Sequence, residues 1–334
     1  MNPLVSVVIT VHNQAPFVAA TLDSVLAQTY RNVEVVVVDD GSTDDTLARC
    51  RRYGDRIRLL PRVNGGVAAA RNTGLAAARG AYIAHLDGDD LWHPDKLARQ
   101  VEVARRFPEA GMIIADGHSF EDGRPDAPGL ITGEMGRRLT AAAEPVVRAD
   151  CYRALIQRHG FNTPSQIMVP AAVYATLGQW DERMRVVTDV ELALRIAGRY
   201  PFVLMRDDLV GYRVHDASLS GPRRSRQFTW GLETFTALRI HRRQADVAAR
   251  RLLAGRMVAD TRILARDAYH VGWHGDRGWA LGYELRLLAA SRRPDLVLPF
   301  VLGLLLPGRL IAATRRLRRP TSADGLGNSF GGSA

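Results

Sequence analysis

Two clusters of acidic residues follow runs of apolar residues that are typical of buried strands. Asp87-Gly88-Asp89-Asp90 comes directly after residues 81–86, and Asp39-Asp40-Gly41-Ser42 comes directly after residues 33–38. Carboxylates this close together repel one another unless a proton or a cation joins them, and oxygen ligands suit Mg²⁺ or Mn²⁺. Such a cation can bridge a substrate diphosphate and neutralise it while a bond to a phosphate oxygen breaks.

Each acidic cluster also has a simpler interpretation. Residues 87–90 could form a solvated turn before a helix that starts near Pro94, and a D-x-D motif alone would favour that turn. The buried strand before it and the second acidic cluster nearby favour a metal site instead. In the second cluster, Gly41 to Thr43 are typical of a turn, whereas the Asp40 carboxylate can accept a hydrogen bond from a nucleobase N–H or a ribose hydroxyl.

Two further segments carry side chains that could contact a nucleotide. His12, in Thr10-Val11-His12-Asn13, offers an aromatic face on which a base could stack. A histidine at a strand end is more often structural when nothing else accompanies it. Arg71 lies in the alanine-rich segment 67–79, which predicts a helix, and an isolated arginine there would be a surface residue.

The elements that must position these residues alternate along the first part of the chain. Strand-like runs at 4–11, 33–38, 57–60 and 81–86 are separated by helical spacing at 15–28 and 67–79 and by a helix through Leu47 and Cys50. This alternation predicts an α/β fold with a mostly parallel sheet flanked by helices. Ligands of such sheets lie beyond the carboxyl ends of the strands, where both acidic clusters are expected.

The remainder of the chain changes character more than once. Residues 120–134 hold several Gly, Pro and Asp and predict a loop, and residues 189–199 predict a helix. Beyond Gly221 the chain is rich in Arg, Ala and Leu, which predicts a helical C-terminal extension. We therefore expect four parts, which are a domain at 1–220, a helical region at 221–295, an apolar and basic segment at 296–319, and a disordered tail at 320–334.

Charge and cysteine content narrow the class of protein. Residues 1–220 carry 25 Lys and Arg and 27 Asp and Glu, whereas residues 221–334 carry 20 and 8, so the net charge of +10 comes from the C-terminal third. A basic region can meet nucleic acid, anionic lipid or a phosphorylated substrate. The two cysteines, Cys50 and Cys151, argue against a disulfide framework or a zinc site. They fit a reducing compartment, and the absence of a signal-peptide pattern agrees with a cytoplasmic location.

Five patches taken together resemble glycosyltransferase family 2 in residue type, order and spacing. They are Val5–Asn13, Asp39–Ser42, Asn64–Gly66, Ala69–Asn72 and Asp87–Asp90, and the resemblance covers roughly residues 3–220. It implies a Rossmann-like GT-A fold, a nucleotide-sugar donor, a divalent metal (Mn²⁺ or Mg²⁺) and inversion at the anomeric carbon. By family habit, the donor would be a UDP-sugar.

The resemblance also implies roles for individual residues in and around the two acidic clusters. The family's nucleotide-sugar site falls on Thr10, His12, Asn13, Asp40, Arg71, Asp87 and Gly88, and its metal ligands on Asp89 and Asp90. The family commonly has Pro and an aromatic residue where this chain has Thr10 and His12. A histidine at position 12 can still stack on a base.

The second half of the domain resembles the family in three more segments. Gly178–Glu182 is similar to its G-x-F-D-E segment, and Thr188–Arg195 to its E-D-x-D-L-x-x-R helix, with Thr in place of the leading Glu. Asp189 takes the position of the general base, which an inverting displacement needs to accept the acceptor's proton; it could also cap the helix. Tyr212–His215 resembles a segment that closes over the diphosphate, where His215 is a further metal ligand or a phosphate contact.

Other functions remain open at this point. A polyprenyl-phosphate glycosyltransferase would use the same donor site, although Asp189 favours the hydroxyl of a glycan or lipid-linked glycan. A nucleic-acid-binding protein lacks support, since no aromatic-interleaved basic platform occurs, and no G-x-G-x-x-G supports a dehydrogenase. The apolar run 296–306, weakened as a helix by Pro299 and Pro307, precedes five arginines. It fits an anionic membrane surface at the inner face of the cell membrane, or a core helix with a basic end.

Overall fold

The computed structural model describes residues 2–121, 124–157, 160–215, 233–234, 237–238, 241, 246–274, 277–292 and 294–305. The chain divides into two compact units, Met1–Met257 and Val258–Ala334. The first unit therefore continues past position 220, where the sequence predicted the end of the first domain. The predictions for 306–319 and for the tail at 320–334 lie outside the described residues.

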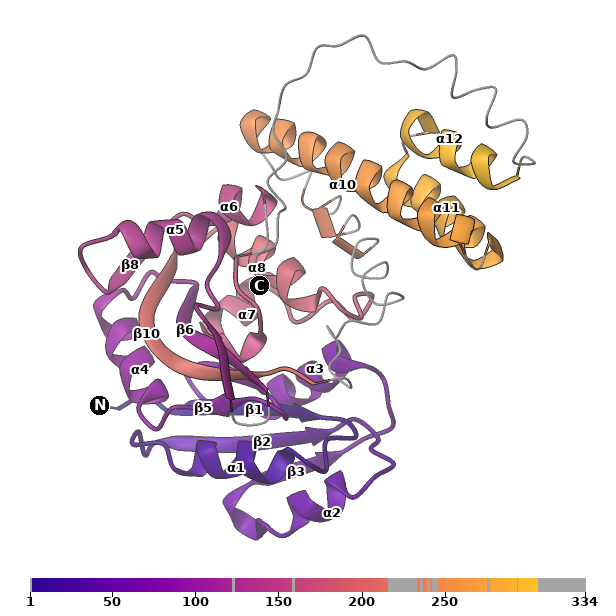
Figure 1. Ribbon diagram of the computed structural model, residues 1–334. Helices are drawn as coiled ribbons and strands as arrows, with labels where there is room; N and C mark the ends of the chain where they lie inside the picture. Colours follow the sequence, from indigo (N-terminus) through magenta and orange to yellow (C-terminus); the bar gives the residue numbers. More distant parts are fainter. Residues whose placement is uncertain are drawn as a thin grey trace. The chain divides into compact units, whose positions relative to one another are not determined.

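The first unit is an α/β structure built on one large sheet (Figure 1). Its elements in chain order are β1 (Val5–Val11), α1 (Val18–Leu26), β2 (Val33–Asp39), α2 (Thr46–Arg51), η1 (Gly54–Arg56), β3 (Arg58–Pro61), α3 (Val67–Ala77), β4 (Tyr82–Asp87), β5 (Leu91–Trp92), α4 (Lys96–Arg106), β6 (Met112–Glu121), β7 (Arg124–Pro128), α5 (Gly133–Ala141), β8 (Val146–Ala149), α6 (Tyr152–Gln157), η2 (Pro164–Gln166), β9 (Ile167–Pro170), α7 (Ala171–Leu177), α8 (Thr188–Ala197) and β10 (Phe202–Arg213).

The sheet combines the predicted parallel half with a mixed half. Its strand order is β3-β2-β1-β4-β9-β6-β10-β5, with β7 paired to β6 and β8 paired to β10. Strand β1 pairs in parallel with β2 and with β4, and β2 pairs in parallel with β3. Strand β10 pairs in parallel with β6, and this is the longest ladder of the sheet. The short strand β9 runs antiparallel between β4 and β6 and joins the two halves. The α/β fold class predicted from the sequence is confirmed.

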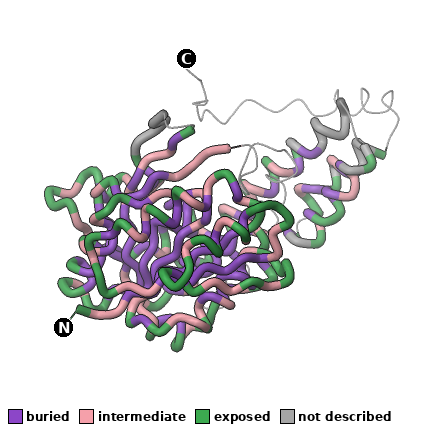
Figure 2. Tube along the Cα trace, turned by 90° about the horizontal axis from the view of Figure 1, so that it is seen from below, coloured by how far each residue is buried: buried purple, intermediate pink, exposed green. Residues whose placement is uncertain are grey.

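Burial on both faces explains the unbroken apolar runs of the parallel strands. Along β2, Val37 belongs to the same buried cluster as Leu22 of α1, whereas Val38 belongs to a second cluster with Ala70 of α3. Successive side chains of a strand point to opposite faces, so helices must cover both sides of the sheet. The buried parts of the trace in Figure 2 run through this layered region.

The structure differs from the sequence prediction at residues 120–134. We expected a loop there, but β6 extends to Glu121 and β7 pairs with it antiparallel, with His118 opposite Pro128 and Phe120 opposite Pro125. Proline is tolerated on an edge strand because its missing N–H is not needed on the unpaired side. The Gly, Pro and Asp content therefore failed to predict the strand that pairs with β6.

The single lysine of the sequence is enclosed in the first unit. Lys96 is fully buried, its Nζ donates to Gln100 Oε1 at 2.8 Å, and the same Nζ lies 3.8 Å from the ring centroid of Trp92. Burial lowers the pKa of Lys96 well below its ordinary value. Gln100 in turn donates to the carbonyls of Ile113 and Gln166, so this group ties α4 to two strands of the sheet.

The second unit is helical in the part that the structure describes. Helix α10 (Val247–His274) crosses into it from the first unit, and α11 (Arg277–Ser291) packs against α12 (Pro294–Leu305). Helix α12 continues through Pro299, which we expected to weaken it, and Val297 and Val301 on either side of the proline in the sequence are buried. Among the described helices, none combines the length and the apolar content required to cross a membrane.

A buried carboxyl group in α11 makes the second unit sensitive to pH. Glu284 is fully buried, its oxygens have no hydrogen-bond partner among the described residues, and burial raises its pKa from 4.5 to about 8. Between these pH values the folded chain keeps a proton that the unfolded chain releases. Stability from this group is therefore complete below pH 4.5 and falls as pH rises toward 8.

We expect Glu284→Gln to slow amide hydrogen exchange in α11 strongly at pH 8.5 and to change it little near pH 4.5. The amide removes the cost of burying a charge without changing the side-chain volume. Exchange measured by mass spectrometry, corrected for the intrinsic pH dependence, would check this. Glu102→Gln, at an exposed position of α4, is the matched control. An equal effect of Glu284→Gln at both pH values would contradict the prediction.

Candidate active site

The carboxyl ends of three adjacent parallel strands bring the predicted site residues together. In the sheet register, Thr10 of β1 lies opposite Asp87 of β4, and Val11 lies opposite Asp39 of β2. The two acidic clusters therefore flank the end of β1, as the alternation of strands and helices predicted. Gly88 makes this packing possible, because a Cβ at that position would lie 2.2 Å from Gln14 Oε1.

The Asp40 side chain fixes the loop that follows β3. Its two oxygens accept hydrogen bonds from the backbone N–H groups of Gly65 at 3.0 Å and Gly66 at 2.8 Å. Arg62 Nη1 lies 3.2 Å from the same carboxylate. Asp40 is only 4% exposed, so a base N–H would have to share the carboxylate oxygens with the donors that already bind them. The nucleotide role assigned to Asp40 stays a prediction, and its structural role is observed.

His12 and Asn13 lie at the same edge, on the exposed side. His12 Nδ1 lies 3.0 Å from the Asp40 carbonyl oxygen, which can only accept, so a hydrogen bond between them requires the proton on Nδ1. Asn13 has a positive φ of 53°, and its side-chain oxygen accepts from Thr43 N at 2.8 Å. Asn13 therefore joins the end of β1 to the turn after β2, while the exposed His12 ring remains accessible to a ligand.

Arg71 joins the acidic edge to the helix that carries the predicted base. Its side chain is 5% exposed and donates to Asp87 Oδ1 at 2.7 Å through Nη2 and to Thr188 Oγ1 at 2.8 Å through Nη1. The guanidinium also lies 4.7 Å from the ring centroid of Trp180. Thr188 stands where the family has a glutamate, so the arginine keeps a partner there although the negative charge is lost.

We expect Arg71→Ala to lower the free energy of unfolding by about 3–5 kcal/mol, because it leaves the Asp87 carboxylate without its charged partner. Arg71→Lys should restore only part of the lost free energy of unfolding, since an ammonium group lacks the planar fork with which the guanidinium reaches both Asp87 and Thr188. Urea unfolding would measure both changes. Arg79→Ala, at a 73% exposed side chain paired with Glu34, is the control and should cost about 1 kcal/mol or less. A similarly small cost for Arg71→Ala would contradict the prediction.

Asp89 and His215 form the pair that best fits a metal. His215 Nε2 lies 3.0 Å from Asp89 Oδ2, and both side chains are 16% exposed. The His215 ring packs on Phe17 with a centroid distance of 4.5 Å, and Arg213 donates to the Asp89 backbone oxygen at 2.9 Å. These contacts bring the segment after β10 onto the acidic turn, 126 residues away in the sequence.

The described residues contain no group of three or more His, Cys, Asp or Glu side chains arranged to hold a metal. That finding is compatible with a metal that shares its ligands with a substrate. Mg²⁺ in particular is usually held by one or two carboxylates together with substrate phosphates rather than by a complete protein cage. A carboxylate and an imidazole in contact suit Mn²⁺ as well.

Asp90 is enclosed by protein donors. Its Oδ2 accepts from Ser165 Oγ at 2.6 Å and from Thr163 Oγ1 at 2.9 Å, and its Oδ1 accepts from Arg213 N at 3.0 Å. The carboxyl group is fully buried, and burial together with the charges of Asp89 and Asp87 raises its pKa well above the ordinary value. Metal ligation by Asp90 stays a prediction, and it would require these donors to move.

The segment 161–170 packs against the acidic turn at residues 87–90. Thr163, Ser165 and Gln166 are at most 1% exposed and face the interior, whereas Asn162 is exposed. Thr163 and Gln166 form a capping box around η2, and Ser165 also accepts a hydrogen bond from Asp87 N at 3.0 Å. Thr163 and Ser165 therefore hold the acidic turn in place, and Gln166 holds Thr163 through the capping box.

Asp189 lies in the first turn of α8 and is 8% exposed. Its Oδ1 accepts from Val190 N at 2.9 Å. Burial raises the pKa of Asp87, and the charges of Asp89 and Asp189 raise it further against the opposing effect of Arg71. Asp189 is therefore close enough to the acidic turn to act electrostatically on it, as a base beside a donor site would be.

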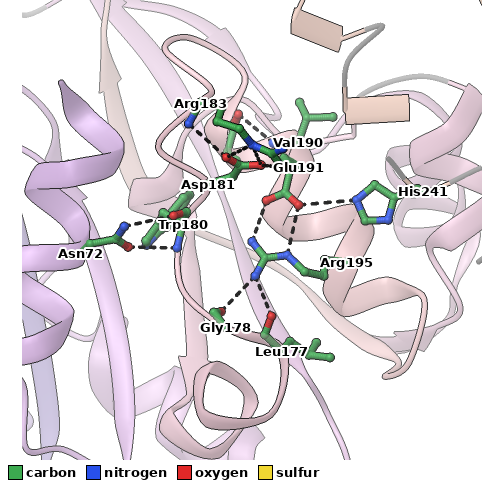
Figure 3. Close-up of polar contacts among 11 residues, drawn as sticks. Asn72, Leu177, Gly178, Trp180, Asp181, Arg183, Val190, Glu191, Arg195 and His241 are labelled. Atoms are coloured by element: carbon green, nitrogen blue, oxygen red, sulfur yellow. Dashed lines mark hydrogen bonds and ion pairs between the residues drawn. The ribbon is translucent and has the colours of Figure 1, made fainter. Parts of the chain in front are cut away.

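A buried ion-pair group holds α8 on its other side (Figure 3). Glu191 accepts from Arg195 Nη2 at 2.6 Å, and Arg195 also donates to the carbonyl oxygens of Leu177 and Gly178. His241 Nε2 lies 3.6 Å from Glu191 Oε1, which is too long for a strong hydrogen bond but suits an ion pair when the ring is protonated. Burial raises the pKa of Glu191, but the contacts with His241 and Arg195 lower it by more. The pKa of Glu191 therefore lies below its ordinary value.

Comparison with known proteins agrees with this geometry. Residues 6–158 match the family described as Glycosyl transferase family 2. An uncharacterized glycosyltransferase of Rickettsia typhi is 30% identical over 216 residues, which cover 65% of this chain and 65% of that protein. The uncharacterized glycosyltransferase EpsJ of Bacillus subtilis is 39% identical over 109 residues, which cover 32% of each chain.

Solved structures share the fold at low sequence identity. TarS of S. aureus in complex with UDP-GlcNAc has a TM-score of 0.59 and 17% identity, covering 92% of this chain and 83% of that one. The mannosyltransferase PcManGT of Pyrobaculum calidifontis in complex with GDP-Man and Mn²⁺ has a TM-score of 0.57 and 20% identity, covering 95% and 87%. The fold is thus the GT-A fold of glycosyltransferases. Residues 6–158 are thus similar to glycosyltransferase family 2, and this chain spans about two thirds of the length of the Rickettsia typhi relative.

Proposed function

We propose that the protein is an inverting glycosyltransferase that moves a sugar from a nucleoside-diphosphate donor, most simply a UDP-sugar, to a hydroxyl of a glycan or lipid-linked glycan. One observation carries the proposal. We call the carboxyl ends of β1, β2 and β4, with Asp40, Asp87 and Asp89, the donor edge. Arg71 bridges Asp87 of this edge and Thr188, the neighbour of Asp189, so one side chain holds both the proposed donor site and the proposed base. A single displacement requires this proximity of a leaving group and a general base.

In the proposed reaction the acceptor oxygen attacks the anomeric carbon from the face opposite the diphosphate. The Asp189 carboxylate takes the proton from that hydroxyl as the new glycosidic C–O bond forms. The bond from the anomeric carbon to the β-phosphate oxygen breaks, and the nucleoside diphosphate leaves with the electron pair. Thr10, His12 and Asp40 lie at the edge where the nucleoside would bind, with His12 offering an exposed ring for the base.

A divalent cation held by Asp89 and His215 would neutralise the diphosphate as negative charge develops on it. Asp87 and Gly88 would then face the sugar and diphosphate. Two protein ligands leave room for phosphate oxygens, which supports a cation that binds together with the donor. The Mn²⁺ in the PcManGT complex supports manganese as the first metal to try.

Calorimetry with UDP, GDP and dTDP, with and without Mn²⁺, would test the donor site. Metal-dependent binding of one nucleotide is expected and would name the donor class. The UDP-GlcNAc complex of TarS and the GDP-Man complex of PcManGT make UDP and GDP the first candidates. No binding of any of the three nucleotides with Mn²⁺ or Mg²⁺ would refute the proposal.

We further propose that the C-terminal third brings the enzyme to an anionic membrane surface. Leu298 and Leu305 of α12 are 43% and 59% exposed, and the sequence continues into Arg309, Arg315, Arg316, Arg318 and Arg319. Apolar side chains beside arginines favour an anionic lipid surface. Flotation with liposomes that contain anionic lipid should capture the protein, and deletion of 296–319 should abolish the capture. Equal flotation after the deletion would refute this part.

A further inference from the structure

The loop that enters α8 presents three successive backbone N–H groups to one carboxylate. Glu233 accepts from Arg185 N at 3.0 Å, from Val186 N at 2.7 Å and from Val187 N at 3.1 Å. Glu233 and Val187 are 46 residues apart in the sequence. Consecutive N–H groups that converge in this way form a concave site for an anion.

The N-terminus of helix α8 receives a carboxylate from outside the helix, in addition to Asp189 and Glu191 of its own first turn. Val187 is the N-cap residue, and no side chain caps the helix from that position. The first N–H groups of a helix lack internal partners, and its N-terminus carries a partial positive charge. Asp189 Oδ1 accepts from Val190 N, inside the first turn. Glu233 therefore supplies the negative charge just before the helix, where a local cap is missing.

The first turn of α8 is also where the chemistry of the site converges. Thr188 accepts from Arg71, which holds Asp87, and Asp189 follows directly. A shift of residues 185–187 would move Thr188 and Asp189 together. We propose that Glu233 is a positioning residue that fixes the general base Asp189 against the donor edge. This inference rests on the proposed function of Asp189.

The described residues after Glu233 support α8 at a second point. His241 is 2% exposed and faces Glu191, which lies one helical turn after Thr188 (Figure 3). Ala237 and Leu238, which lie between Glu233 and His241 in the sequence, are fully buried. The chain beyond position 220, predicted as a separate helical region, thus contributes two contacts to the catalytic helix. Positional control of the base is expected from Glu233, because it binds the backbone directly before Asp189.

The decisive variant is Glu233→Gln, which keeps the size of the side chain but replaces one acceptor oxygen with an N–H₂ group and removes the charge. We expect kcat for nucleotide release from the sugar donor to fall by about 10- to 100-fold, the range expected for a small displacement of a catalytic group. The Kd for nucleotide with Mn²⁺ should change by less than about twofold, because the donor edge keeps Asp40, Asp87 and Asp89. Glu233→Asp should restore part of kcat, and Glu102→Gln should change nothing.

Amide hydrogen exchange of residues 183–197 provides a readout that does not depend on activity. In Glu233→Gln, the amides of residues 185–187 should exchange at least about tenfold faster, with the first turn of α8 affected and α3 unaffected. Unchanged exchange at 185–187, or a loss of kcat matched by an equal loss of nucleotide affinity, would overturn the inference. If Glu233→Gln does not fold, the same measurements on Glu233→Asp decide it. A wild-type protein that binds no nucleotide would refute the proposed function, while the exchange result would still decide whether Glu233 positions α8.

Discussion

Asp189→Asn is expected to reduce kcat by about 10²- to 10⁴-fold, the usual contribution of a general base. The amide is nearly the same size and can still accept from Val190 N, but it cannot take a proton at neutral pH. The loss should therefore appear in kcat, while the Kd for nucleotide and metal stays the same. Transfer assays and calorimetry on the same preparation would measure both quantities.

Asp150→Asn is the matched control for this prediction, because Asp150 is exposed and its Oδ1 likewise accepts a backbone N–H, from Tyr152. Full activity of Asp189→Asn would show that no proton has to be removed by this residue. That result would favour an acceptor that is already ionised, such as a polyprenyl phosphate. The one substitution thus separates the two enzymatic hypotheses.

Asp89→Asn and His215→Ala are expected to weaken metal-dependent nucleotide binding by at least about 10-fold each, because both side chains belong to the proposed metal site. The two atoms lie 3.0 Å apart, so both substitutions act on the same place. Their effects should be less than additive in the double variant, since either change alone removes the shared ion. Calorimetry with Mn²⁺ and with EDTA would measure the metal-dependent part.

His93→Ala is the control for the histidine, since His93 follows the same acidic turn but is 52% exposed and pairs with Asp95 instead. Equal nucleotide affinity with Mn²⁺ and with EDTA in the wild type would contradict a metal-dependent site. Loss of binding in Asp89→Asn alone would assign the metal to the carboxylate and leave His215 with a role in packing on Phe17.

The parallel half of the sheet could be predicted because its signals are local. The strands ending at Asp39 and Asp87 are largely apolar runs, and parallel strands place their carboxyl ends at one edge. The meeting of the two acidic clusters at that edge therefore followed from the order of the elements. The structure confirms this part of the fold. Strand β7 was missed because its prolines are typical of loops, and only pairing with β6 makes it a strand.

The contacts that hold the site could not be predicted from the sequence. Ser165 reaches Asp90 across 75 residues, and Glu233 reaches Val187 across 46. No periodicity or spacing announces a hydrogen bond over such distances, and each side chain would be an ordinary polar residue in isolation. The motif residues that resemble the family predict where the ligands bind, whereas the residues that support them become visible only in three dimensions.

The enclosure of Lys96 gives the chain a built-in reporter of its own unfolding. Lys96 carries the only side-chain amine in the 334 residues, and that amine is fully buried against Gln100 and Trp92. An amine-selective acylating reagent can reach it only when α4 separates from the sheet. The rate at which acylation appears on the peptide containing Lys96 therefore measures how often this part of the fold opens, without an introduced label.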